Sequence, residues 1–335
     1  MSKILVTGGT GLLGSHLLFE LVKSGVKPIA IKRTTSDVKK VLNLFSLYTT
    51  KAELLFNMIT WKTCNILDLL ELNNIVKDVT QIYHCASLVS FNPKLKNKII
   101  DTNYIGTSNI VNLALKHNIS KLCHVSSIST FSSNKGKAIN EDCFWSWENK
   151  SPYAISKHLA EMEIWRGIAE GLNATIVNPS IIIGPGEFQN SINNIIKVIK
   201  KKLPFYPSGS CGIIDVKDLV KIMIQLMEKS IHSEQFIISS HNIKYKELLQ
   251  FIANQVNIPP PKFMVGKITI NILLKIYHVI NFFKKNTPKL HVDSLRRAHS
   301  KIVLDSSKIQ EKLFFEYTDY RKSILEAISL LETKH

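Results

Sequence analysis

The first half of the chain alternates short apolar runs with longer stretches in which apolar residues recur every three or four positions. Short apolar runs are typical of buried parallel strands, and the three-to-four spacing is typical of amphipathic helices. The pattern predicts strands at Lys3–Thr7, Pro28–Lys32, Met58–Thr63, Thr80–His84, Lys121–Ser126 and Ala174–Asn178. It predicts helices at Leu12–Lys23, Asp37–Asn57, Lys98–His117 and Tyr153–Glu170. This order indicates an α/β fold, a Rossmann-type doubly wound parallel sheet with crossover helices.

The pattern changes after Pro179, where helical runs dominate. They lie at Ile192–Lys201, Lys217–Lys229, Lys244–Val256, Ile268–Phe283 and Tyr320–Leu331, with one strand at Gln235–Ser239. We therefore expect a nucleotide-binding domain at residues 1–180, with residues 210–240 returning to it. Residues 181–335 should form a smaller, mostly helical, C-terminal substrate cap over the sheet edge where such folds bind ligands.

The most apolar stretch, Ile268–Phe283, is shorter than the roughly 20 residues that a membrane span needs, and polar residues interrupt it. We interpret it as a cap helix over an apolar pocket, with docking to a membrane surface as the alternative. No integral span is expected. The apolar run before the first glycine turn is too short for a signal peptide, which predicts a cytoplasmic protein.

Net charge and cysteines narrow the classes of partner. Lys and Arg number 43 against 26 Asp and Glu, a formal charge of +17. Such a charge can indicate nucleic acid or acidic lipid, but the lysines are scattered and no basic motif contains interleaved aromatic residues. We interpret the charge as compositional and predict no nucleic-acid partner. The five cysteines have no metal-ligand spacing, which predicts reduced thiols and no metal site.

A glycine-rich turn follows the first strand and opens the first helix. In it, Gly8 permits a tight turn, Gly11 permits close approach of a pyrophosphate, and Gly14 permits close packing of helix on strand. The free N–H groups at the helix start favour phosphate. We predict cofactor contacts along the turn from Gly8, Thr10, Gly11, Leu12, Leu13 and Gly14.

The end of the second strand distinguishes the two nicotinamide cofactors. An acidic residue there binds the ribose hydroxyls of NAD, whereas a basic residue pairs with the 2′-phosphate of NADP. This chain has Lys32 and Arg33, and no acid before Asp37. Guanidinium groups match phosphate geometry. The sequence therefore favours NADP(H), with NAD(H) as the alternative.

A tyrosine and a lysine, Tyr153 and Lys157, lie one turn apart at the start of a predicted helix. Ser151 is suited to cap that helix and Pro152 to its first position. An ammonium beside a phenol lowers the pKa of the phenol and makes it a better proton donor and acceptor. A serine pair ends the fifth strand, where a hydroxyl can hold a substrate oxygen.

The glycine spacing, the Tyr-x-x-x-Lys pair and the strand-end serine together resemble the extended short-chain dehydrogenase/reductase branch. This branch is also called the NAD-dependent epimerase/dehydratase family. The resemblance runs from Lys3 to about Leu219 and is closest to members like dihydroflavonol reductase and 3β-hydroxysteroid dehydrogenase. It implies that Tyr153 transfers the proton, that Lys157 orients the cofactor, and that Ser127, with Ser126 as the alternative, fixes the substrate oxygen.

The resemblance also implies further contacts. Cofactor contacts are implied for Asn65, Ile66, Cys85, Ala86, Ser87, Val125, Pro179 and Ile182, besides Tyr153 and Lys157. Substrate contacts are implied for Val89, Ser127 and Asn178. Asn103 is expected to brace the sheet, and Asp215 and Asp218 to tie the cap to the core. A homodimer through the helices at Lys98–His117 and Tyr153–Glu170 is the family expectation.

Three functions compete within this resemblance. The favoured one is an NADP(H)-dependent oxidoreductase that interconverts a small-molecule carbonyl and a secondary alcohol. Ala154 stands where nucleotide-sugar enzymes carry glycine, and Ile128-Ser129 stands where dehydratases carry an acid pair. The alternative is a nucleotide-sugar epimerase with bound NAD, because Asn178 resembles an epimerase residue that reaches a substrate phosphate. A non-catalytic NADP sensor would require a broken catalytic set, which is intact here.

Overall fold

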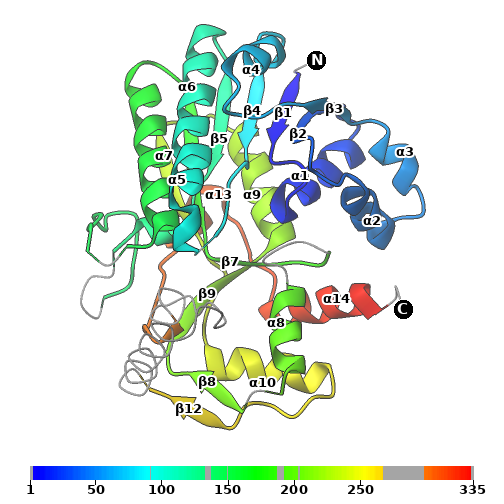
Figure 1. The fold of residues 1–335 in the computed structure, drawn as a ribbon, viewed down its shortest axis with the longest axis vertical. Helices are drawn as coiled ribbons and strands as arrows, with labels where there is room; N and C mark the ends of the chain where they lie inside the picture. Colours follow the sequence, from blue (N-terminus) through cyan, green and yellow to red (C-terminus); the bar gives the residue numbers. More distant parts are fainter. Residues whose placement is uncertain are drawn as a thin grey trace.

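A computed structural model describes residues 3–90, 92–132, 137–148, 150–186, 192–202, 204–266 and 298–332. Within these residues, the main layer is a seven-stranded parallel sheet in the order β10-β6-β5-β4-β1-β2-β3 (Figure 1). The predicted α/β Rossmann-type fold is therefore confirmed. The strands are β1 (Ile4–Thr7), β2 (Ile29–Lys32), β3 (Thr60–Thr63), β4 (Gln81–His84), β5 (Lys121–Val125), β6 (Ala174–Pro179) and β10 (Glu234–Ile238).

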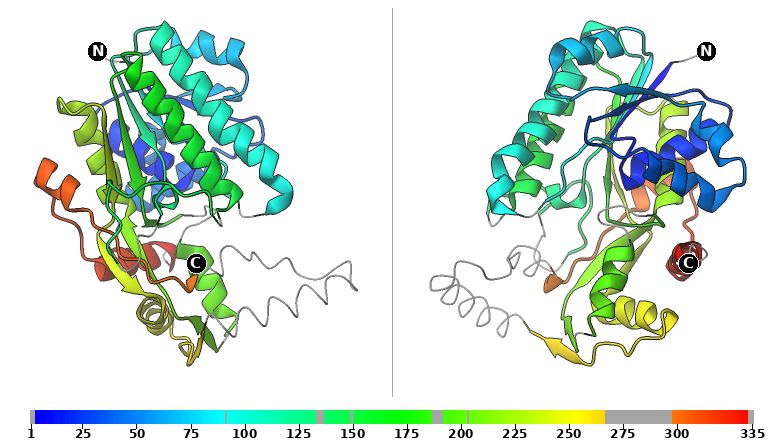
Figure 2. Two further views of the ribbon diagram at one scale, coloured as in Figure 1. Left: turned by 90° about the vertical axis from the view of Figure 1, so that its left-hand side faces the viewer. Right: turned by 45° about the vertical axis from the view of Figure 1, so that its right-hand side comes forward.

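Helices cover both faces of the sheet, because successive strand residues point to opposite sides. Ile4 and Val6 join one apolar core and Leu5 joins the other. The first face carries α1 (Leu12–Lys23), α2 (Lys39–Tyr48), α3 (Ala52–Phe56) and α9 (Val216–Glu228). The opposite face carries α4 (Leu69–Val76), α5 (Lys96–Ile100), α6 (Gly106–Lys116) and α7 (Pro152–Ala169), as Figure 2 shows.

Two local features on the faces differ from the prediction. The single helix expected at Asp37–Asn57 is broken into α2 and α3. Thr49 adopts an extended backbone there (φ −159°, ψ 149°), and its hydroxyl accepts a hydrogen bond from the Lys51 N–H at 3.2 Å. Helix α4 was not predicted. It is capped by Asp68, whose carboxylate accepts the Glu71 N–H at 3.1 Å.

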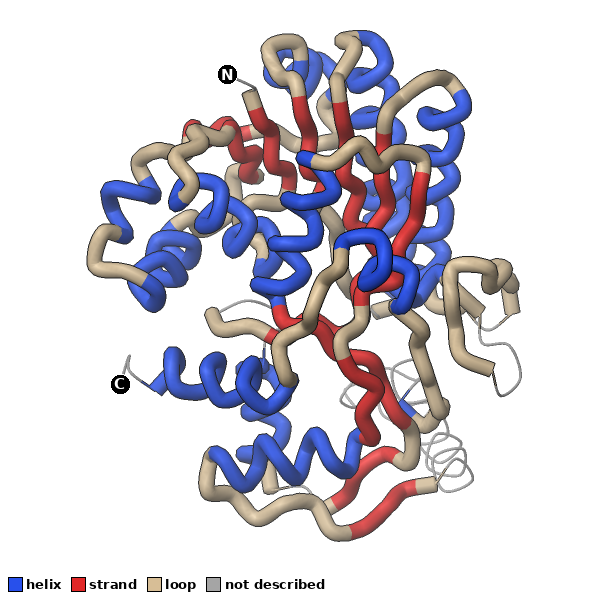
Figure 3. The backbone as a smooth tube through the Cα atoms, turned by 180° about the vertical axis from the view of Figure 1, so that it is seen from behind, coloured by secondary structure: helices blue, strands red, loops and turns tan. Residues whose placement is uncertain are grey.

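The C-terminal elements lie beyond the carboxyl ends of the main strands (Figure 1). The expected helices are present there as α8 (Ile192–Lys200), α10 (Tyr245–Gln255) and α14 (Tyr320–Glu332). A further helix, α13 (Ser307–Leu313), instead returns to the main sheet and packs beside β10. In the same described part, strands that the sequence did not predict form a three-stranded sheet and a two-stranded sheet (Figure 3). They are β7 (Ile181–Ile183), β9 (Ser210–Asp215) and β11 (His241–Lys244), and β8 (Phe205–Pro207) with β12 (Phe263–Val265).

The predicted helices at Ile268–Phe283 and Lys98–His117 have different outcomes. The helix expected at Ile268–Phe283 lies outside the described residues. Among the residues that are described, no helix is long and apolar enough to span a bilayer. The predicted helix at Lys98–His117 is interrupted by a π-helical turn, η2 (Asp101–Ile105). Such turns are often found at functional sites.

Candidate active site

The β1–α1 turn is shaped by its glycines. Gly8 has a positive φ of 70°, and a Cβ there would lie 2.7 Å from the Ala86 backbone nitrogen. At Gly14 a Cβ would lie 2.3 Å from the Gly8 carbonyl oxygen. Gly11 differs, because it is exposed and the Gly8 oxygen, at 3.3 Å, would be its nearest described neighbour. The turn therefore fits a phosphate group on the outer side of Gly11, at the start of α1.

The carboxyl end of β2 carries the residues expected to select the cofactor. Lys32 is the last residue of β2 and Arg33 follows it on the surface. The Arg33 N–H donates to the Ser36 hydroxyl at 3.2 Å, which turns the chain back toward α2. The structure thus brings both basic residues to the same sheet edge as the glycine turn.

The implied cofactor contacts Asn65 and Ile66 lie in two different environments. Asn65 is exposed and its side chain accepts the Leu67 N–H at 3.2 Å. Ile66 is buried against Gly106, where an added Cβ would lie 2.5 Å from its terminal carbon. Ile66 therefore packs α6 against the chain after β3, in addition to any contact with a cofactor.

The segment after β4 holds the next predicted contacts, which are Cys85, Ala86, Ser87 and Val89, all half-buried. Beneath it, His84 Nδ1 lies 2.8 Å from the Thr7 hydroxyl and His84 Nε2 lies 2.9 Å from the Thr107 hydroxyl. Burial, with a smaller effect of Lys157, lowers the pKa of His84 to about 3. This histidine is neutral at physiological pH and joins β1, β4 and α6.

Asn103 ties the same segment to α7 (Pro152–Ala169), the helix that carries Tyr153 and Lys157. Its amide oxygen accepts the Leu88 N–H at 2.7 Å. Its amide nitrogen donates to the Leu88 carbonyl at 3.1 Å and to the Ser156 hydroxyl at 2.9 Å. Asn103 lies in the π turn η2, which aims its side chain between β4 and α7. These contacts agree with the bracing role that the resemblance implied.

The start of α7 presents the Tyr-Lys pair. Ser151 caps the helix by accepting the Ala154 N–H at 3.2 Å, and Pro152 occupies the first turn. Lys157 is only 2% exposed, and its ammonium donates to the Val125 carbonyl at the end of β5 over 2.8 Å. Burial lowers the pKa of Lys157 to about 8, while the Glu161 carboxylate opposes that shift. Tyr153 lies one turn earlier and is half-buried.

The serine pair separates into one buried and one accessible residue. Ser126 is 3% exposed, whereas Ser127 is half-buried. Ser127 has an extended backbone (φ −164°, ψ 148°) and caps the short helix η3 (Ile128–Thr130), its hydroxyl accepting the Ser129 N–H at 3.2 Å. The geometry therefore favours Ser127 over Ser126 for contact with a substrate.

Asn178, for which a substrate contact was implied, lies inside the protein. It is fully buried at the end of β6. Its amide nitrogen lies 3.1 Å from the Ser127 carbonyl and 3.0 Å from the Thr130 hydroxyl, and also donates to Glu161. Its amide oxygen accepts from Gln235 at 3.0 Å. These contacts place Asn178 behind Ser127 and occupy its polar atoms, so they do not support a substrate contact, which stays a prediction.

This cluster contains residues that the sequence reasoning missed. Glu161, Thr130 and Gln235 were not singled out, yet all three contact Asn178. A signal for Glu161 was available, because it lies four residues after Lys157 on the same helical face. A charged residue on a buried helix face usually has a hydrogen-bonding or ion-pair partner.

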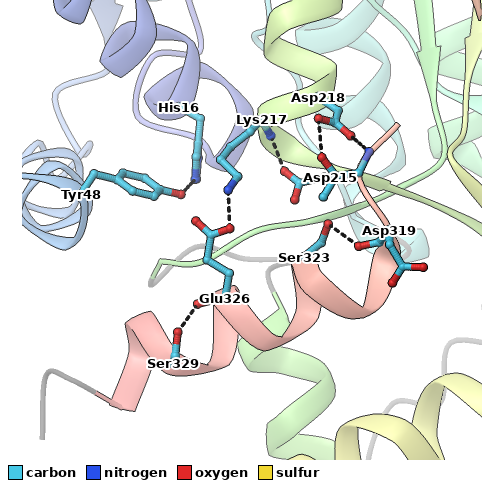
Figure 4. Close-up of polar contacts among 10 residues, drawn as sticks. His16, Tyr48, Asp215, Lys217, Asp218, Asp319, Ser323, Glu326 and Ser329 are labelled. Carbon is cyan, nitrogen blue, oxygen red and sulfur yellow. Dashed lines mark hydrogen bonds and ion pairs between the residues drawn. The ribbon is translucent and has the colours of Figure 1, made fainter. Parts of the chain in front are cut away.

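Of the two aspartates expected to tie the cap to the core, Asp218 makes a contact of this kind and Asp215 makes a local one (Figure 4). Asp215 caps α9 by accepting the Lys217 N–H at 2.6 Å. Asp218 accepts the Thr318 N–H at 2.7 Å and the Thr318 hydroxyl at 3.0 Å. Lys217 forms an ion pair with Glu326 of α14. The chain before α14, and α14 itself, are thereby held against α9.

A parallel sheet with a glycine turn after β1, and a Tyr-x-x-x-Lys helix after β5, define a Rossmann-type NAD(P)-binding oxidoreductase. The sequence model of the NAD dependent epimerase/dehydratase family matches residues 4–239. The chain therefore belongs to this family of enzymes, which the motifs had indicated.

Individual relatives agree with this assignment. The chain is 26% identical over 334 residues to sterol demethylase protein B of Methylococcus capsulatus, covering 97% of each protein. It is 22% identical to a putative dihydroflavonol 4-reductase of Synechocystis sp., covering 96% of this chain and 92% of that protein. Tetraketide alpha-pyrone reductase 2 of Arabidopsis thaliana is 28% identical over 273 residues, with 76% and 83% covered.

Solved structures share the fold over the whole chain. The crystal structure of gox2253 matches with a TM-score of 0.81 at 22% identity, covering 100% of this chain and 99% of that one. The Bordetella bronchiseptica enzyme WbmG, solved with NAD and UDP, matches with a TM-score of 0.77 at 17% identity, covering 99% and 96%. At these identities the likeness concerns the fold.

Proposed function

We propose that this protein is an NADP(H)-dependent oxidoreductase that interconverts a carbonyl and a secondary alcohol. The observation that carries the proposal is the arrangement at the start of α7. Tyr153 and Lys157 lie one turn apart there, and the Lys157 ammonium is fixed to the Val125 carbonyl, two residues before Ser127. Because α7 packs against η3, this arrangement supports a phenol, an ammonium and a hydroxyl that act together at the carboxyl edge of the sheet.

Each of these side chains has a distinct role in the proposed reaction. Ser127 donates a hydrogen bond to the substrate oxygen and fixes its position. Tyr153 donates a proton to that oxygen during reduction and accepts it during oxidation. Lys157 carries a charge that favours the phenolate of Tyr153 and lowers its pKa. Because Lys157 is held by a backbone carbonyl, its charge stays in one place.

The residues around the glycine turn fit a nicotinamide dinucleotide. The exposed Gly11 and the start of α1 would hold its pyrophosphate, and Lys32 with Arg33 would hold a 2′-phosphate. When bound, this cofactor supplies or accepts the hydride. The two basic residues are the reason why we propose NADP(H) rather than NAD(H).

Two observations support a reductase over an epimerase. The names of several relatives are those of reductases, among them the Synechocystis and Arabidopsis proteins. The sequence argument for an epimerase rested on Asn178, whose amide is used by Ser127, Thr130, Glu161 and Gln235. That argument no longer favours the epimerase. A homodimer through α6 and α7 remains a prediction.

A direct test is to assay the purified protein with NADPH and with NADH against a panel of ketones and aldehydes that includes sterol and flavonoid carbonyls. We expect oxidation of NADPH that depends on the carbonyl, and weaker activity with NADH. A parallel assay with UDP-sugars and NAD tests the epimerase. Interconversion of UDP-sugars without turnover of any carbonyl would overturn the proposal.

A further inference from the structure

Glu161 is a carboxylate inside the protein that the proposed reaction does not use. It lies on α7 one turn beyond Lys157 and is only 4% exposed. Its Oε1 accepts hydrogen bonds from the Thr130 hydroxyl at 2.9 Å and from the Asn178 amide. Burying a carboxylate is costly unless it is hydrogen-bonded, and here the bonding partners belong to two other elements.

Both partners of Glu161 also hold the backbone of Ser127. The Thr130 hydroxyl lies 2.9 Å from the Ser127 carbonyl, and its single proton is shared between that oxygen and Glu161. The Asn178 amide donates to the same carbonyl at 3.1 Å, and the Thr130 N–H is a further donor to it at 3.2 Å. Gln235 of β10 fixes the other end of the Asn178 amide. The Ser127 carbonyl is therefore held by a cluster whose shared acceptor is Glu161, and which we call the Glu161 cluster (Glu161, Thr130, Asn178 and Gln235).

We propose that Glu161 is a positioning residue for Ser127, acting through Thr130 and Asn178. Ser127 lies at the junction of β5 and η3, where no regular ladder continues to hold it. The contacts on its carbonyl therefore set the direction in which its hydroxyl points. Misplacing a reacting group by about 1 Å can lower a rate by about a hundredfold. The inference rests on the proposed role of Ser127.

The charge of Glu161 has a second effect, on Lys157. Besides Tyr153, one turn before it on α7, the titratable groups around Lys157 in the described part of the chain include Glu161 on its own helix, Cys85 and His84 near the end of β4, and His124 on β5. Burial lowers the pKa of both histidines and raises that of the Cys85 thiol, so all three are neutral at physiological pH. Burial raises the pKa of Glu161, and the hydrogen bonds that its carboxylate accepts oppose that shift. In its ionised form, Glu161 is the group in this set that helps Lys157 to keep its proton.

Two substitutions separate hydrogen bonding from charge. Glu161→Leu removes the acceptor, and we expect kcat to fall by about tenfold or more while KM for NADPH stays within about twofold. Glu161→Gln keeps an acceptor oxygen and should restore kcat near pH 7. Because it lacks the charge, the alkaline fall of its pH–rate curve should move to lower pH. The control is Glu163→Gln, which lies on the same helix and pairs with Arg166 at 2.9 Å.

A kcat of Glu161→Leu within about twofold of wild type would overturn the proposal, and so would a Glu161→Gln variant as slow as Glu161→Leu. If Glu161→Leu does not fold, Thr130→Val removes one of the three contacts on the Ser127 carbonyl and leaves those of the Asn178 amide and the Thr130 N–H. We expect it to lower kcat about threefold or more. An unchanged kcat for Thr130→Val would then contradict the proposal.

The test of Glu161 can be distinguished from the test of the proposed function. The variants are compared on whichever reaction the wild type catalyses, so a failure of carbonyl reduction alone does not decide the matter. A crystal structure of Glu161→Leu gives a readout independent of activity. We expect a displaced Ser127 carbonyl that has lost the Asn178 contact, and an unmoved carbonyl would count against Glu161.

Discussion

The candidate site is built by different means in two neighbouring regions. Around the β1–α1 turn, the chain exposes its backbone, and the absence of side chains at Gly8, Gly11 and Gly14 permits close contacts. Around the start of α7, the chain presents side chains whose polar atoms are hydrogen-bonded to other residues. An example is the Lys157 ammonium, which donates to the Val125 carbonyl. The first region is therefore sensitive to added atoms, and the second to lost hydrogen bonds and charges.

The largest effect should come from removing the phenol hydroxyl in the side-chain region. We expect Tyr153→Phe to lower kcat by about a thousandfold, because a positioned proton donor contributes about 10²–10⁴ in rate. The Kd for NADPH should change little, since the ring remains. Steady-state kinetics and fluorescence titration of NADPH measure the two. Turnover near the wild-type level would remove Tyr153 from the proposed reaction.

The backbone region should respond to a single methyl group. We expect Gly14→Ala to destabilise the protein by about 3 kcal/mol, because its Cβ would meet a backbone oxygen that cannot easily move. Thermal unfolding of the variant measures this loss.

A matched control is Gly266→Ala, whose Cβ would meet no described heavy atom within 4 Å. Gly11→Ala sharpens the comparison, since its Cβ would lie 3.3 Å from the Gly8 oxygen. It should lower the unfolding temperature much less than Gly14→Ala does, while weakening NADPH binding. Equal unfolding temperatures for the variants at Gly14 and Gly266 would contradict the prediction.

A smaller effect is expected at the end of β2, beside the glycine turn, where the 2′-phosphate of the cofactor would lie. Arg33→Ala should weaken NADPH binding by about 10- to 100-fold, the usual value of a hydrogen bond to a charged group. Binding of NADH should hardly change, because it has no 2′-phosphate. The exposed Lys27, at the other end of β2, provides the control Lys27→Ala. An equal loss of affinity for NADPH and NADH would show that Arg33 does not bind the 2′-phosphate.

The smallest effect concerns pH. Since the pKa of Lys157 is lowered to about 8, its ammonium is lost as pH rises through that value, and kcat should fall above about pH 8. The unfolded chain keeps this proton up to its ordinary pKa near 10.4, so between these values it binds more protons than the folded protein does. In this window Lys157 makes unfolding less favourable as pH rises. Urea unfolding of wild type and Lys157→Met should diverge there, and parallel curves would disprove the assignment.

Much of the fold was predictable because its signals are local. The glycine turn lies between a strand and a helix, and Ser151-Pro152 marks the start of α7 in sequence as it does in the structure. The strands β7 and β9 were missed for a physical reason. Short apolar segments such as Ile181–Ile183 lack alternation, and they become strands by pairing with residues far along the chain.

The site was less predictable, because burial of polar residues depends on tertiary contacts. The sequence indicated the positions of Tyr153 and Lys157, whose spacing matters within one helix. It could not show that Asn178 faces inward, since that depends on Glu161 and Gln235, which lie 17 and 57 residues away. The spacing to Lys157 was a signal for Glu161 alone, and its contacts with Thr130, Asn178 and Gln235 emerge only from the folded structure.

The order of strands in the main sheet has a consequence for how the protein is made. Strand β6 is buried along its whole length, and its outer partner β10 is translated more than 50 residues later. A nascent chain that has reached residue 180 already contains the nucleotide-binding turn and the Tyr-Lys helix, yet it has an uncovered apolar edge. Such edges pair with other chains. A fragment cut at that point should therefore aggregate instead of serving as a free-standing nucleotide-binding unit.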